Sequence, residues 1–422
     1  MKAPFIYKIK RLYWLAKAYL ANLIYGSPSR SLKIIGVTGT NGKTTTCFFI
    51  DNILREAGFK TARMTTVDFH LGGTPKPNPI HLTTFGAFQL QKFLKKAKEN
   101  KIDWVILELS SHGLEQERAR GVSLDAGVIT YVLREHIDFH KTIENYLEAK
   151  ARILSMIKQE GFAVLNRDDK NYEFFKKRLS KKVITFGIIR GMVKAERIEY
   201  GENKTSFLLS TPKGSTRVII NLPGRFNVSN ALAASAVGIG LGIDLHTIKQ
   251  GLEKMDFVPG RMEEIKEKGQ QFKLIVDFVH TPDALALVLE SLREQLKGKG
   301  RIIIVFGMPG ERDPFNRPLM GEIASMRADI VILTNENPRS EPPMEIINQI
   351  SKGVKGKKEG VTFFKILDRE KAIAKAISLA QPQDIVLIAG KGAENYIEFK
   401  DKTIPWDDRL VSRKLLKKYL KK

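Results

Sequence analysis

Short apolar runs alternate with amphipathic helical stretches along most of the chain. Such runs occur at residues 32–35, 104–109, 126–132 and 162–166, and polar residues bound each of them. Runs of this length between helical stretches predict buried strands joined by helical crossovers. We therefore expect an α/β fold with a mostly parallel, doubly wound sheet, whose ligands bind at the carboxyl ends of the strands.

Two departures from this alternation predict the domain organisation. Residues 183–222 have shorter and more alternating runs, which predict an antiparallel appendage to the sheet. Pro259-Gly260 predicts a hinge. Beyond it, short apolar strands recur between helices, at residues 274–278, 302–306, 330–334 and 385–389. We expect a central domain at residues 32–258 and a C-terminal, Rossmann-like α/β domain at residues 259–422.

The first 31 residues differ from the rest. They contain no acidic residue, and their basic and aromatic residues are Lys2, Phe5, Tyr7, Lys8, Lys10, Arg11, Tyr13, Trp14, Lys17, Tyr19, Tyr25 and Arg30. Residues 12–24 carry one charge and are shorter than the ~20 residues that span a bilayer. Two interpretations stay open: an interfacial helix on an anionic membrane surface, or a helix docked on the protein's own surface. Residues 26–29 then predict a linker.

Composition narrows the partner classes. The 422-residue chain has a formal net charge of +24, which indicates an anionic partner such as a nucleotide, a phosphorylated substrate or acidic lipid. No aromatic-and-basic motif typical of nucleic-acid binding stands out, so we expect no nucleic-acid partner. The single cysteine, Cys47, excludes an internal disulfide and fits a reducing cytoplasm. We expect a cytoplasmic monomer, peripheral to the inner membrane face if the first helix binds lipid.

Residues 36–46, with the sequence GVTGTNGKTTT, form the strongest local signal. A glycine-rich turn between a strand and a helix leaves backbone N–H groups at a helix N-terminus, where the dipole favours anions. Gly39 and Gly42 allow close approach of the backbone. Lys43 can neutralise the outer phosphates, and Thr44 can place a hydroxyl on Mg²⁺. We interpret this stretch as the nucleoside-triphosphate site of a P-loop domain.

Eleven motifs then follow in order. They are TGTNGKTT (38–45), LELSSHGL (107–114), REHIDFH (134–140), YLEAK (146–150), GRFNVSNALAA (224–234), PGRME (259–263), DFVHTPDAL (277–285), FGMPGERD (306–313), RPLMG (317–321), NENPRSEPP (335–343) and AGKGAENY (389–396). This series resembles the Mur ligase family, and within it the MurE-type branch of tripeptide synthetases. The resemblance implies an ATP-dependent ligase of cell-wall peptidoglycan synthesis.

The implied reaction explains the residue types. Such a ligase phosphorylates a carboxylate and lets an amine displace the phosphate, so crowded anions need metal ions and fixed positive groups. By resemblance, Lys43 is catalytic, and Thr44 and Glu108 hold the Mg²⁺ between the β- and γ-phosphates, since hard oxygen ligands suit magnesium. The resemblance also implies a second Mg²⁺, with His136 as a ligand. Lys150, which by sequence alone is a helix-surface lysine, is by resemblance carbamylated near that ion.

The resemblance implies further contacts with ATP. The implied residues are Gly39, Thr40, Asn41, Gly42, Lys43, Thr44, Thr45, Asn166, Asn227, Asn230, Arg261 and Asp277. Amides suit adenine because they offer both a donor and an acceptor. Arg261 lies at the expected hinge, where domain closure would exclude water from the acyl phosphate.

Substrate contacts are implied in the same way. For the acceptor they are Thr83, Thr84, Ser110 and Arg118; for the amino acid they are Arg312, Asn337, Arg339, Gly390 and Glu394. The family's meso-diaminopimelate enzymes carry D-N-P-R, and this chain has E-N-P-R at residues 336–339. A guanidinium suits a bidentate grip on the second carboxylate of diaminopimelate, which is therefore the expected substrate. Glu336 in place of aspartate leaves L-lysine or another diamino acid open.

The front of the chain departs from the family pattern. Residues 1–31 precede the P-loop strand, where the family usually has a UDP-binding domain. We expect a UDP-MurNAc-L-Ala-D-Glu-type acceptor; the alternative is a related Mur ligase that acts on a lipid-linked or pseudomurein-type acceptor. An alternative of another class is a non-catalytic ATP-binding scaffold at the membrane. Such a scaffold would show no ATP hydrolysis that depends on acceptor and amino acid.

Overall fold

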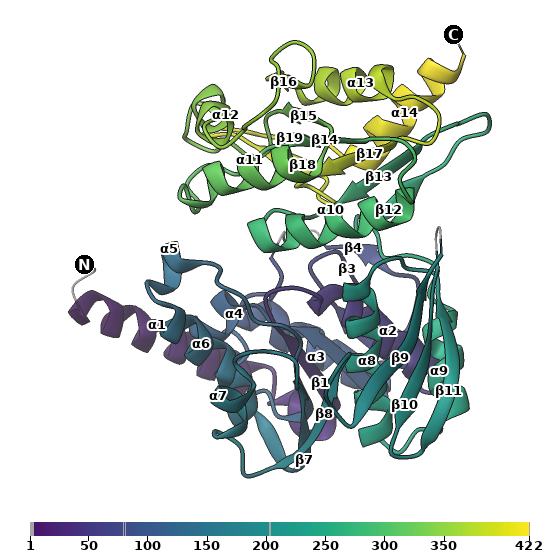
Figure 1. Ribbon diagram of the computed structural model, residues 1–422. Coiled ribbons are helices and arrows are strands. Elements are labelled where there is room, and N and C mark those ends of the chain that lie inside the picture. The colour runs from purple at the N-terminus through teal and green to yellow at the C-terminus, as the bar shows by residue number, and fades with distance from the viewer. Residues whose placement is uncertain (1–3, 79, 81, 202–203, 422) are drawn as a thin grey trace. The chain divides into compact units, whose positions relative to one another are not determined.

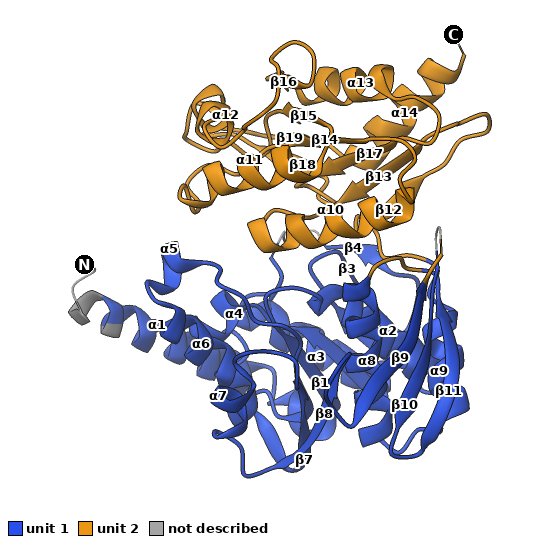
Figure 2. Ribbon diagram, in the orientation of Figure 1, with its two compact units in different colours: residues 1–199, 204–221, 225–256 blue, residues 200–203, 222–224, 257–422 orange. Residues whose placement is uncertain are grey.

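The computed structural model describes residues 4–78, 80, 82–201 and 204–421, without the side chains of residues 4–6 and 8. Lys2, one of the basic residues noted above, lies outside the described residues, as do the side chains of Phe5 and Lys8. The elements in Figure 1 fall into two units. Unit 1 comprises Met1–Glu199, Lys204–Asn221 and Arg225–Asp256, and unit 2 is chiefly Phe257–Lys422 (Figure 2).

The sheet of unit 1 is centred on the strand that leads into the glycine-rich loop. Its described strands are β1 (Lys33–Thr38), β2 (Thr61–Met64), β3 (Asp68–Leu71), β4 (Lys76–Pro77), β5 (Trp104–Glu108), β6 (Leu124–Ile129), β7 (Ile157–Asn166), β8 (Lys182–Gly187), β9 (Val193–Tyr200), β10 (Thr205–Thr211) and β11 (Gly214–Ile220). Their order is β11-β10-β9-β8-β7-β6-β1-β5-β2-β3-β4. β1 pairs in parallel with β5 and β6, and the parallel pairing continues through β9. The predicted mostly parallel sheet is confirmed.

The prediction of an antiparallel appendage at residues 183–222 is wrong for its first half. β8 pairs in parallel with β7, and β9 pairs in parallel with β8. β10 and β11 form an antiparallel hairpin across the turn at Thr211 and Gly214, so the second half of the segment contains antiparallel pairing. Helix α7 (Tyr172–Lys176) lies between β7 and β8, and such a crossover returns the chain in the same direction. Alternation of side chains alone does not reveal strand direction.

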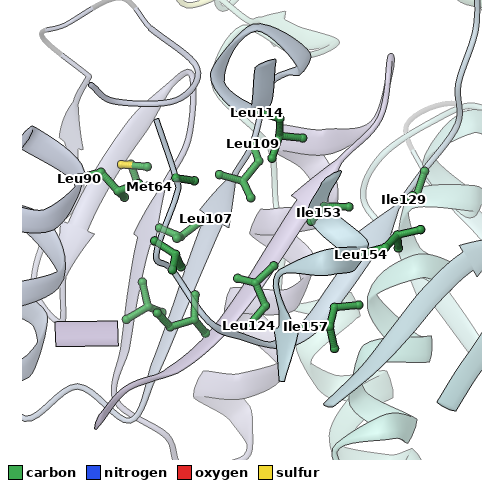
Figure 3. Packing of buried hydrophobic residues seen from close by; sticks show 14 of the residues in the cluster. Met64, Leu90, Leu107, Leu109, Leu114, Leu124, Ile129, Ile153, Leu154 and Ile157 are labelled. Carbon is green, nitrogen blue, oxygen red and sulfur yellow. The ribbon is translucent and has the colours of Figure 1, made fainter. Parts of the chain in front are cut away.

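Helices cover both faces of this sheet. They are α1 (Pro4–Ile24), α2 (Lys43–Glu56), α3 (Ala87–Glu99), α4 (Ser111–Glu115), α5 (Ile137–His140), α6 (Ile143–Ser155), α7, α8 (Arg225–Gly240) and α9 (Leu245–Glu253). Helix α2 packs against α8 and α9. On the other side, α3, α4 and α6 bury leucine and isoleucine side chains against β5 and β6 (Figure 3). The carboxyl ends of β1 and β5 are thereby held rigidly.

Unit 2 is a smaller α/β unit with its own core. Its six-stranded sheet has the order β12 (Glu263–Ile265), β13 (Lys273–Asp277), β17 (Ile385–Ala389), β14 (Ile302–Phe306), β15 (Ile330–Leu333), β16 (Phe363–Lys365). All its pairs are parallel except β12 with β13. The helices are α10 (Pro282–Leu296), α11 (Asn316–Arg327), α12 (Pro343–Ser351), α13 (Arg369–Leu379) and α14 (Asp408–Leu420), and a hairpin joins β18 (Tyr396–Glu398) to β19 (Thr403–Pro405).

The segment predicted as a linker at residues 26–29 is instead packed on unit 1. Residues Pro28–Ser31 form a 3₁₀ turn, and the buried Ser29 hydroxyl donates a hydrogen bond to the Gly121 carbonyl at 3.0 Å. A short polar stretch with proline and glycine looks like a linker because its long-range hydrogen bonds are invisible in the sequence. Among the residues that the structure describes, no helix combines the length and apolar composition that a membrane crossing requires.

Candidate active site

The loop between β1 and α2 requires its glycines. Gly42 has φ 85°, a left-handed conformation that disfavours side chains, and a Cβ there would lie 2.1 Å from Asn230 Oδ1. A Cβ on Gly39 would lie 1.9 Å from Thr130 Oγ1. Side chains at these two positions would therefore clash with neighbouring residues. The loop leads into the N-terminus of α2, whose free backbone N–H groups can bind an anion.

Glu108 ends β5 directly beside this loop, because β1 and β5 are parallel neighbours with Val37 opposite Glu108. The Thr44 hydroxyl donates to the two carboxylate oxygens of Glu108 at 3.1 and 3.0 Å. Thr66 also contacts this buried carboxylate, through its backbone N–H at 2.8 Å and its hydroxyl at 3.0 Å. The carboxylate and hydroxyls are hard oxygen donors.

This donor set fits Mg²⁺. No group of three or more His, Cys, Asp or Glu side chains suited to a metal ion occurs in the described ranges. Magnesium commonly takes only one or two carboxylates from the protein, and substrate phosphates and water complete its octahedron. The pair of Thr44 and Glu108 at an anion-binding helix end matches that requirement.

Two lysines converge on the backbone of the same loop. Lys43 Nζ donates to the Thr40 carbonyl at 2.8 Å, and Lys150 Nζ donates to the Gly39 carbonyl at 2.6 Å. Lys150 is 1% exposed, so its appearance as a surface lysine in the sequence is wrong: it lies on the inner face of α6. Burial, and next the charge of Lys43, lower the pKa of Lys150 well below its ordinary value. This favours a neutral amine.

An aromatic and histidine cluster lies beside these lysines. The hydroxyls of Tyr146 and Thr40 are 2.8 Å apart, and the Tyr146 hydroxyl donates to Glu135 at 3.3 Å. His136 Nε2 lies 3.6 Å from Glu135 Oε1, and the rings of His136 and His112 have centroids 4.6 Å apart. The structure therefore brings His136 and Lys150, which the resemblance pairs at one metal ion, to the same cluster.

The four residues predicted for the acceptor lie next to Glu108. Thr66 Oγ1 donates to Thr83 Oγ1 at 3.0 Å. Thr84 accepts from the Ser110 backbone N–H at 2.8 Å, and Arg118 donates to the Thr84 carbonyl at 2.9 Å. Ser110 also caps α4, since its hydroxyl accepts from the Gly113 N–H. These side chains are held by one another at the carboxyl end of β5.

The asparagines predicted for adenine divide into two groups. Asn230 lies against Gly42 of the loop and donates to Asn227 at 3.2 Å, and both are on α8. Asn166 ends β7, and its side chain accepts from the Asp168 N–H at 2.9 Å. Within the loop itself, the Thr40 N–H donates to Tyr131 at 2.7 Å, and Asn41 forms a β-bridge with Tyr131.

Arg261 and Asp277, also predicted for ATP, both belong to unit 2. Asp277 is buried, and its two oxygens accept from the N–H groups of Met262 and Val279 at 2.7 Å each. Burial raises the pKa of this carboxyl. Arg261 stacks on the ring of Phe278, with its guanidinium carbon 4.4 Å from the centroid. In unit 2, Asp277 therefore organises backbone, and its contact with ATP stays a prediction.

Most residues predicted for the amino acid form one polar cluster in unit 2. Asn337 donates to Glu394 at 3.1 Å and accepts from Lys391 at 3.0 Å. Lys391 also pairs with Glu394 at 2.9 Å. Arg339 pairs with Glu398 at 2.9 Å and donates to the Gly310 carbonyl at 2.7 Å. Gly390 and Glu394 thus lie with Asn337 and Arg339. Arg312 is an exposed side chain whose charge, like that of Arg339, acts on Tyr396 of β18.

Several residues of these sites were not predicted as site residues. Nothing in the sequence marks Thr66 as a site residue, because it follows β2 and lies in none of the quoted motifs. Tyr146, His112 and Lys391 lie inside the quoted motifs, so each could have been chosen from them. Glu336 was noted only as a departure. It is buried against Gly390, burial raises its pKa, and one of its oxygens has no hydrogen-bond partner among the described residues.

An anion-binding loop with an oxygen-ligand pair beside it, on a parallel sheet, is the arrangement with which P-loop proteins bind nucleotides. Two family models match the chain: the Mur ligase middle domain at residues 37–238, and the Mur ligase, glutamate ligase domain at residues 260–392. The chain belongs to the Mur ligase family, and the predicted resemblance is confirmed.

Curated relatives match nearly the whole chain. A UDP-N-acetylmuramoyl-L-alanyl-D-glutamate–2,6-diaminopimelate ligase of Bacillus velezensis is 39% identical over 414 residues, which are 96% of this chain and 83% of that protein. A ligase of the same name from Geobacillus kaustophilus is 40% identical over 95% of this chain and 82% of that protein.

Solved structures show the same fold. A structure of a ligase with this name has a TM-score of 0.63 at 34% identity, and covers 92% of this chain and 79% of that one. Folylpolyglutamate synthase of Mycobacterium tuberculosis has a TM-score of 0.74 at 17% identity, over 90% of this chain and 93% of that one. The second likeness concerns the fold alone.

Proposed function

We propose that this protein is an ATP-dependent ligase that joins meso-diaminopimelate to UDP-N-acetylmuramoyl-L-alanyl-D-glutamate in peptidoglycan synthesis. The observation that carries the proposal is the convergence, at the end of β1 and β5, of the loop, the Thr44–Glu108 pair and the buried Lys150. Identity of 39% over 96% of the chain to a ligase of that name supports the same substrates.

The reaction has two steps. A carboxylate oxygen of the acceptor attacks the γ-phosphorus of ATP, ADP leaves, and an acyl phosphate forms. The unprotonated amine of the diamino acid then attacks the acyl carbon. The tetrahedral intermediate expels phosphate, and the nitrogen loses one proton, which leaves with phosphate or solvent, to give the amide. Lys43 and the N-terminus of α2 stabilise the charge that develops on the β- and γ-phosphates. Bound Mg²⁺ supplies further charge neutralisation there.

Lys150 is proposed to be carbamylated. A neutral Nζ attacks carbon dioxide, a C–N bond forms, and one proton is released to give a carbamate anion. Complete burial and the nearby Lys43 favour the neutral amine that this step needs. His136, in the same cluster as Tyr146 and Glu135, would then share a second Mg²⁺ with the carbamate. Removing bicarbonate and carbon dioxide from the assay should lower activity, and adding bicarbonate should restore it.

The unit 2 cluster is proposed to hold the diamino acid. Arg339 would bind a carboxylate, because a planar guanidinium makes two parallel hydrogen bonds to one. Asn337 and Glu394 would bind an ammonium group by their oxygens. We further propose that the enzyme works as a cytoplasmic monomer; peripheral membrane association is a property of α1 and is independent of the ligase reaction.

Phosphate release by the purified protein tests the proposal. The assay contains Mg-ATP and UDP-MurNAc-L-Ala-D-Glu, with meso-diaminopimelate, L-lysine, L-ornithine or no amino acid, and the product mass is recorded. Release with diaminopimelate alone and the matching tripeptide mass are expected. Release with L-lysine instead would change the assigned amino acid. Binding of ATP without release under any condition would refute the soluble acceptor, and lipid-linked acceptors would be assayed next.

A further inference from the structure

Helix α1 is docked on unit 1 by one face only. Ala18 and Ala21 are fully buried and pack with Ala87 of α3. The side chain of Asn22 is buried and donates to the Arg120 carbonyl at 2.7 Å. On the same side, Arg11 lies 3.6 Å from the buried Glu117. These contacts fix which face of α1 points away from unit 1.

The opposite face of α1 is apolar and exposed. Its members are Ile9, Leu12, Tyr13, Ala16, Tyr19, Leu20, Leu23 and Ile24. At 3.6 residues per turn they fall within about 140° of the helix circumference. Leu23 is 78% exposed and Leu12 is 66% exposed. We call this set the outer face of α1. Figure 1 shows helix α1 at the periphery of unit 1.

Such a face needs a partner. Soluble monomers rarely expose contiguous apolar patches of this kind, and larger ones mark protein or membrane interfaces. Scattered single exposed apolar residues are ordinary, but here seven large ones share one side of one helix. Tyr19 lies at the edge of the outer face and its side chain hydrogen-bonds Arg120 of unit 1. The other large members of the outer face are not part of the cluster that Ala18 and Ala21 form with α3, so that packing does not explain their apolar character.

The positive charges beside the outer face favour an anionic partner. Lys10 and Lys17 are exposed at its margin, and no acidic residue precedes Asp51. Glu117, which pairs with Arg11 of α1, is buried and also pairs with Arg152 on α6. Lysines beside an apolar face with tyrosines are the pattern of helices that lie in the headgroup region of anionic bilayers. Apposition of two copies would instead bring these lysines together.

We propose that the outer face of α1 is an in-plane anchor for an anionic membrane surface. The helix lies parallel to the bilayer with Leu12, Leu20 and Leu23 in the acyl boundary, and Lys10 and Lys17 meet the lipid phosphates. Unit 1 is then held at the membrane by the docked face, without a membrane-spanning segment. This anchor is independent of the ligase chemistry and extends beyond it.

Vesicle co-sedimentation of the full-length protein, without substrates, tests the anchor. The vesicles are phosphatidylcholine alone, or phosphatidylcholine mixed with phosphatidylglycerol. We expect at least about tenfold stronger binding to the anionic vesicles, weakened by salt. The variant Leu12→Glu/Leu23→Glu should lose at least about tenfold of that binding, because two charges enter the apolar boundary. Lys10→Gln/Lys17→Gln should lose the anionic preference several-fold.

A matched control carries the same change of charge elsewhere. Ile189 and Met326 are 71% and 75% exposed, so Ile189→Glu/Met326→Glu should bind vesicles like the wild type. Circular dichroism and phosphate release with the soluble acceptor should be unchanged in all variants, which separates loss of the anchor from loss of the enzyme. Failure of the folded wild type to bind vesicles, or equal loss in the control, would overturn the proposal. So would a wild-type dimer that Leu12→Glu/Leu23→Glu converts to a monomer.

Discussion

The two polar clusters of the molecule handle charge in opposite ways. In unit 1, Lys43 and Lys150 both donate to carbonyls of one loop, and the charge of Lys43, after burial, lowers the pKa of Lys150. In unit 2, Lys391 pairs with Glu394 and Arg339 pairs with Glu398, so opposite charges are matched. The first arrangement suits a ligand with several negative charges, because Lys43 lies at the N-terminus of α2, which also favours anions. The second suits an amino acid, which carries both signs.

The two clusters also differ in how burial affects the free energy of their charged groups. Burial disfavours the charged form of Lys150, and burial together with the charge of Lys43 lowers its pKa in spite of Glu135 and Asp169. In unit 2 the ion pairs are already formed. A bound substrate must therefore replace existing partners of these side chains, which reduces the net gain in binding free energy. Substitutions in unit 1 should therefore act on the chemical step, and those in unit 2 chiefly on substrate affinity.

The largest effect is expected from Lys43→Met. Loss of the positive charge of Lys43 should lower kcat by about 10³-fold, since stabilisation of the transferred phosphoryl group is mainly electrostatic. Phosphate release under saturating substrates measures it. Lys92, an exposed lysine of α3, provides the control Lys92→Met, which should retain full activity. Retention of kcat within a few-fold in Lys43→Met would contradict the assigned role.

The next prediction concerns stability and the buried charges around Asp51. In unit 1, Asp51 is 2.7 Å from Arg63 and 3.1 Å from His70. Burial opposes its ionisation, but the hydrogen bond with His70 and the charge of Arg63 outweigh burial and lower its pKa to about 2. Asp51→Asn should reduce the free energy of unfolding by about 3 kcal/mol, because it leaves Arg63 buried without this partner.

The pH dependence of that loss has a defined sign. Because the folded pKa of about 2 is below the ordinary aspartate pKa of 3.8, the stabilisation by Asp51 is present above pH 3.8 and disappears as pH falls towards 2. Hydrogen exchange of α2 and β2 at pH values across this window measures it. The wild type and Asp51→Asn should converge at the acidic end. A difference that stays constant with pH would show that packing, not ionisation, is responsible.

Local patterns predicted much of the fold. The strand at Ile302–Phe306 and the strand at Ile385–Ala389 have the expected bounds, since each is a short buried run between turn residues. The direction of β8 and β9 was missed because side-chain alternation is the same in parallel and antiparallel strands. The packing of residues 26–29 was missed because it depends on Gly121, far along the chain.

The candidate sites divide in the same way. The loop around Gly39 and Gly42 is readable because its function depends on consecutive backbone groups. Thr66 was not predicted, since only the fold brings it to Glu108. The buried position of Lys150 was also hidden: its placement on the inner face of α6 depends on how that helix packs. Long-range side-chain contacts are the part that one sequence does not display.

A smaller effect is expected from Arg339→Lys in unit 2. An ammonium cannot reproduce the two parallel hydrogen bonds of a guanidinium, so KM for diaminopimelate should rise about 10- to 100-fold with little change in kcat. Initial rates at saturating ATP and acceptor measure both constants. Arg293, exposed and paired with Asp329, supplies the control Arg293→Lys, which should leave KM unchanged. A fall in kcat of that size with an unchanged KM would instead show that Arg339 acts in the chemical step.

The smallest effect is expected from Glu336→Asp, which restores the aspartate of the D-N-P-R pattern. Glu336 is buried near Lys391 and Arg369, whose charges favour the carboxylate while burial raises its pKa. Aspartate keeps the carboxylate but is one methylene shorter, so its carboxylate lies farther from Gly390. The nearby side chains of Lys391 and Arg369 can shift to follow it. KM for diaminopimelate should change about threefold, with an unaltered preference over L-lysine. A tenfold shift in that preference would instead make Glu336 a determinant of amino-acid selection, and unit 2 would then depend on one carboxylate as unit 1 depends on Glu108.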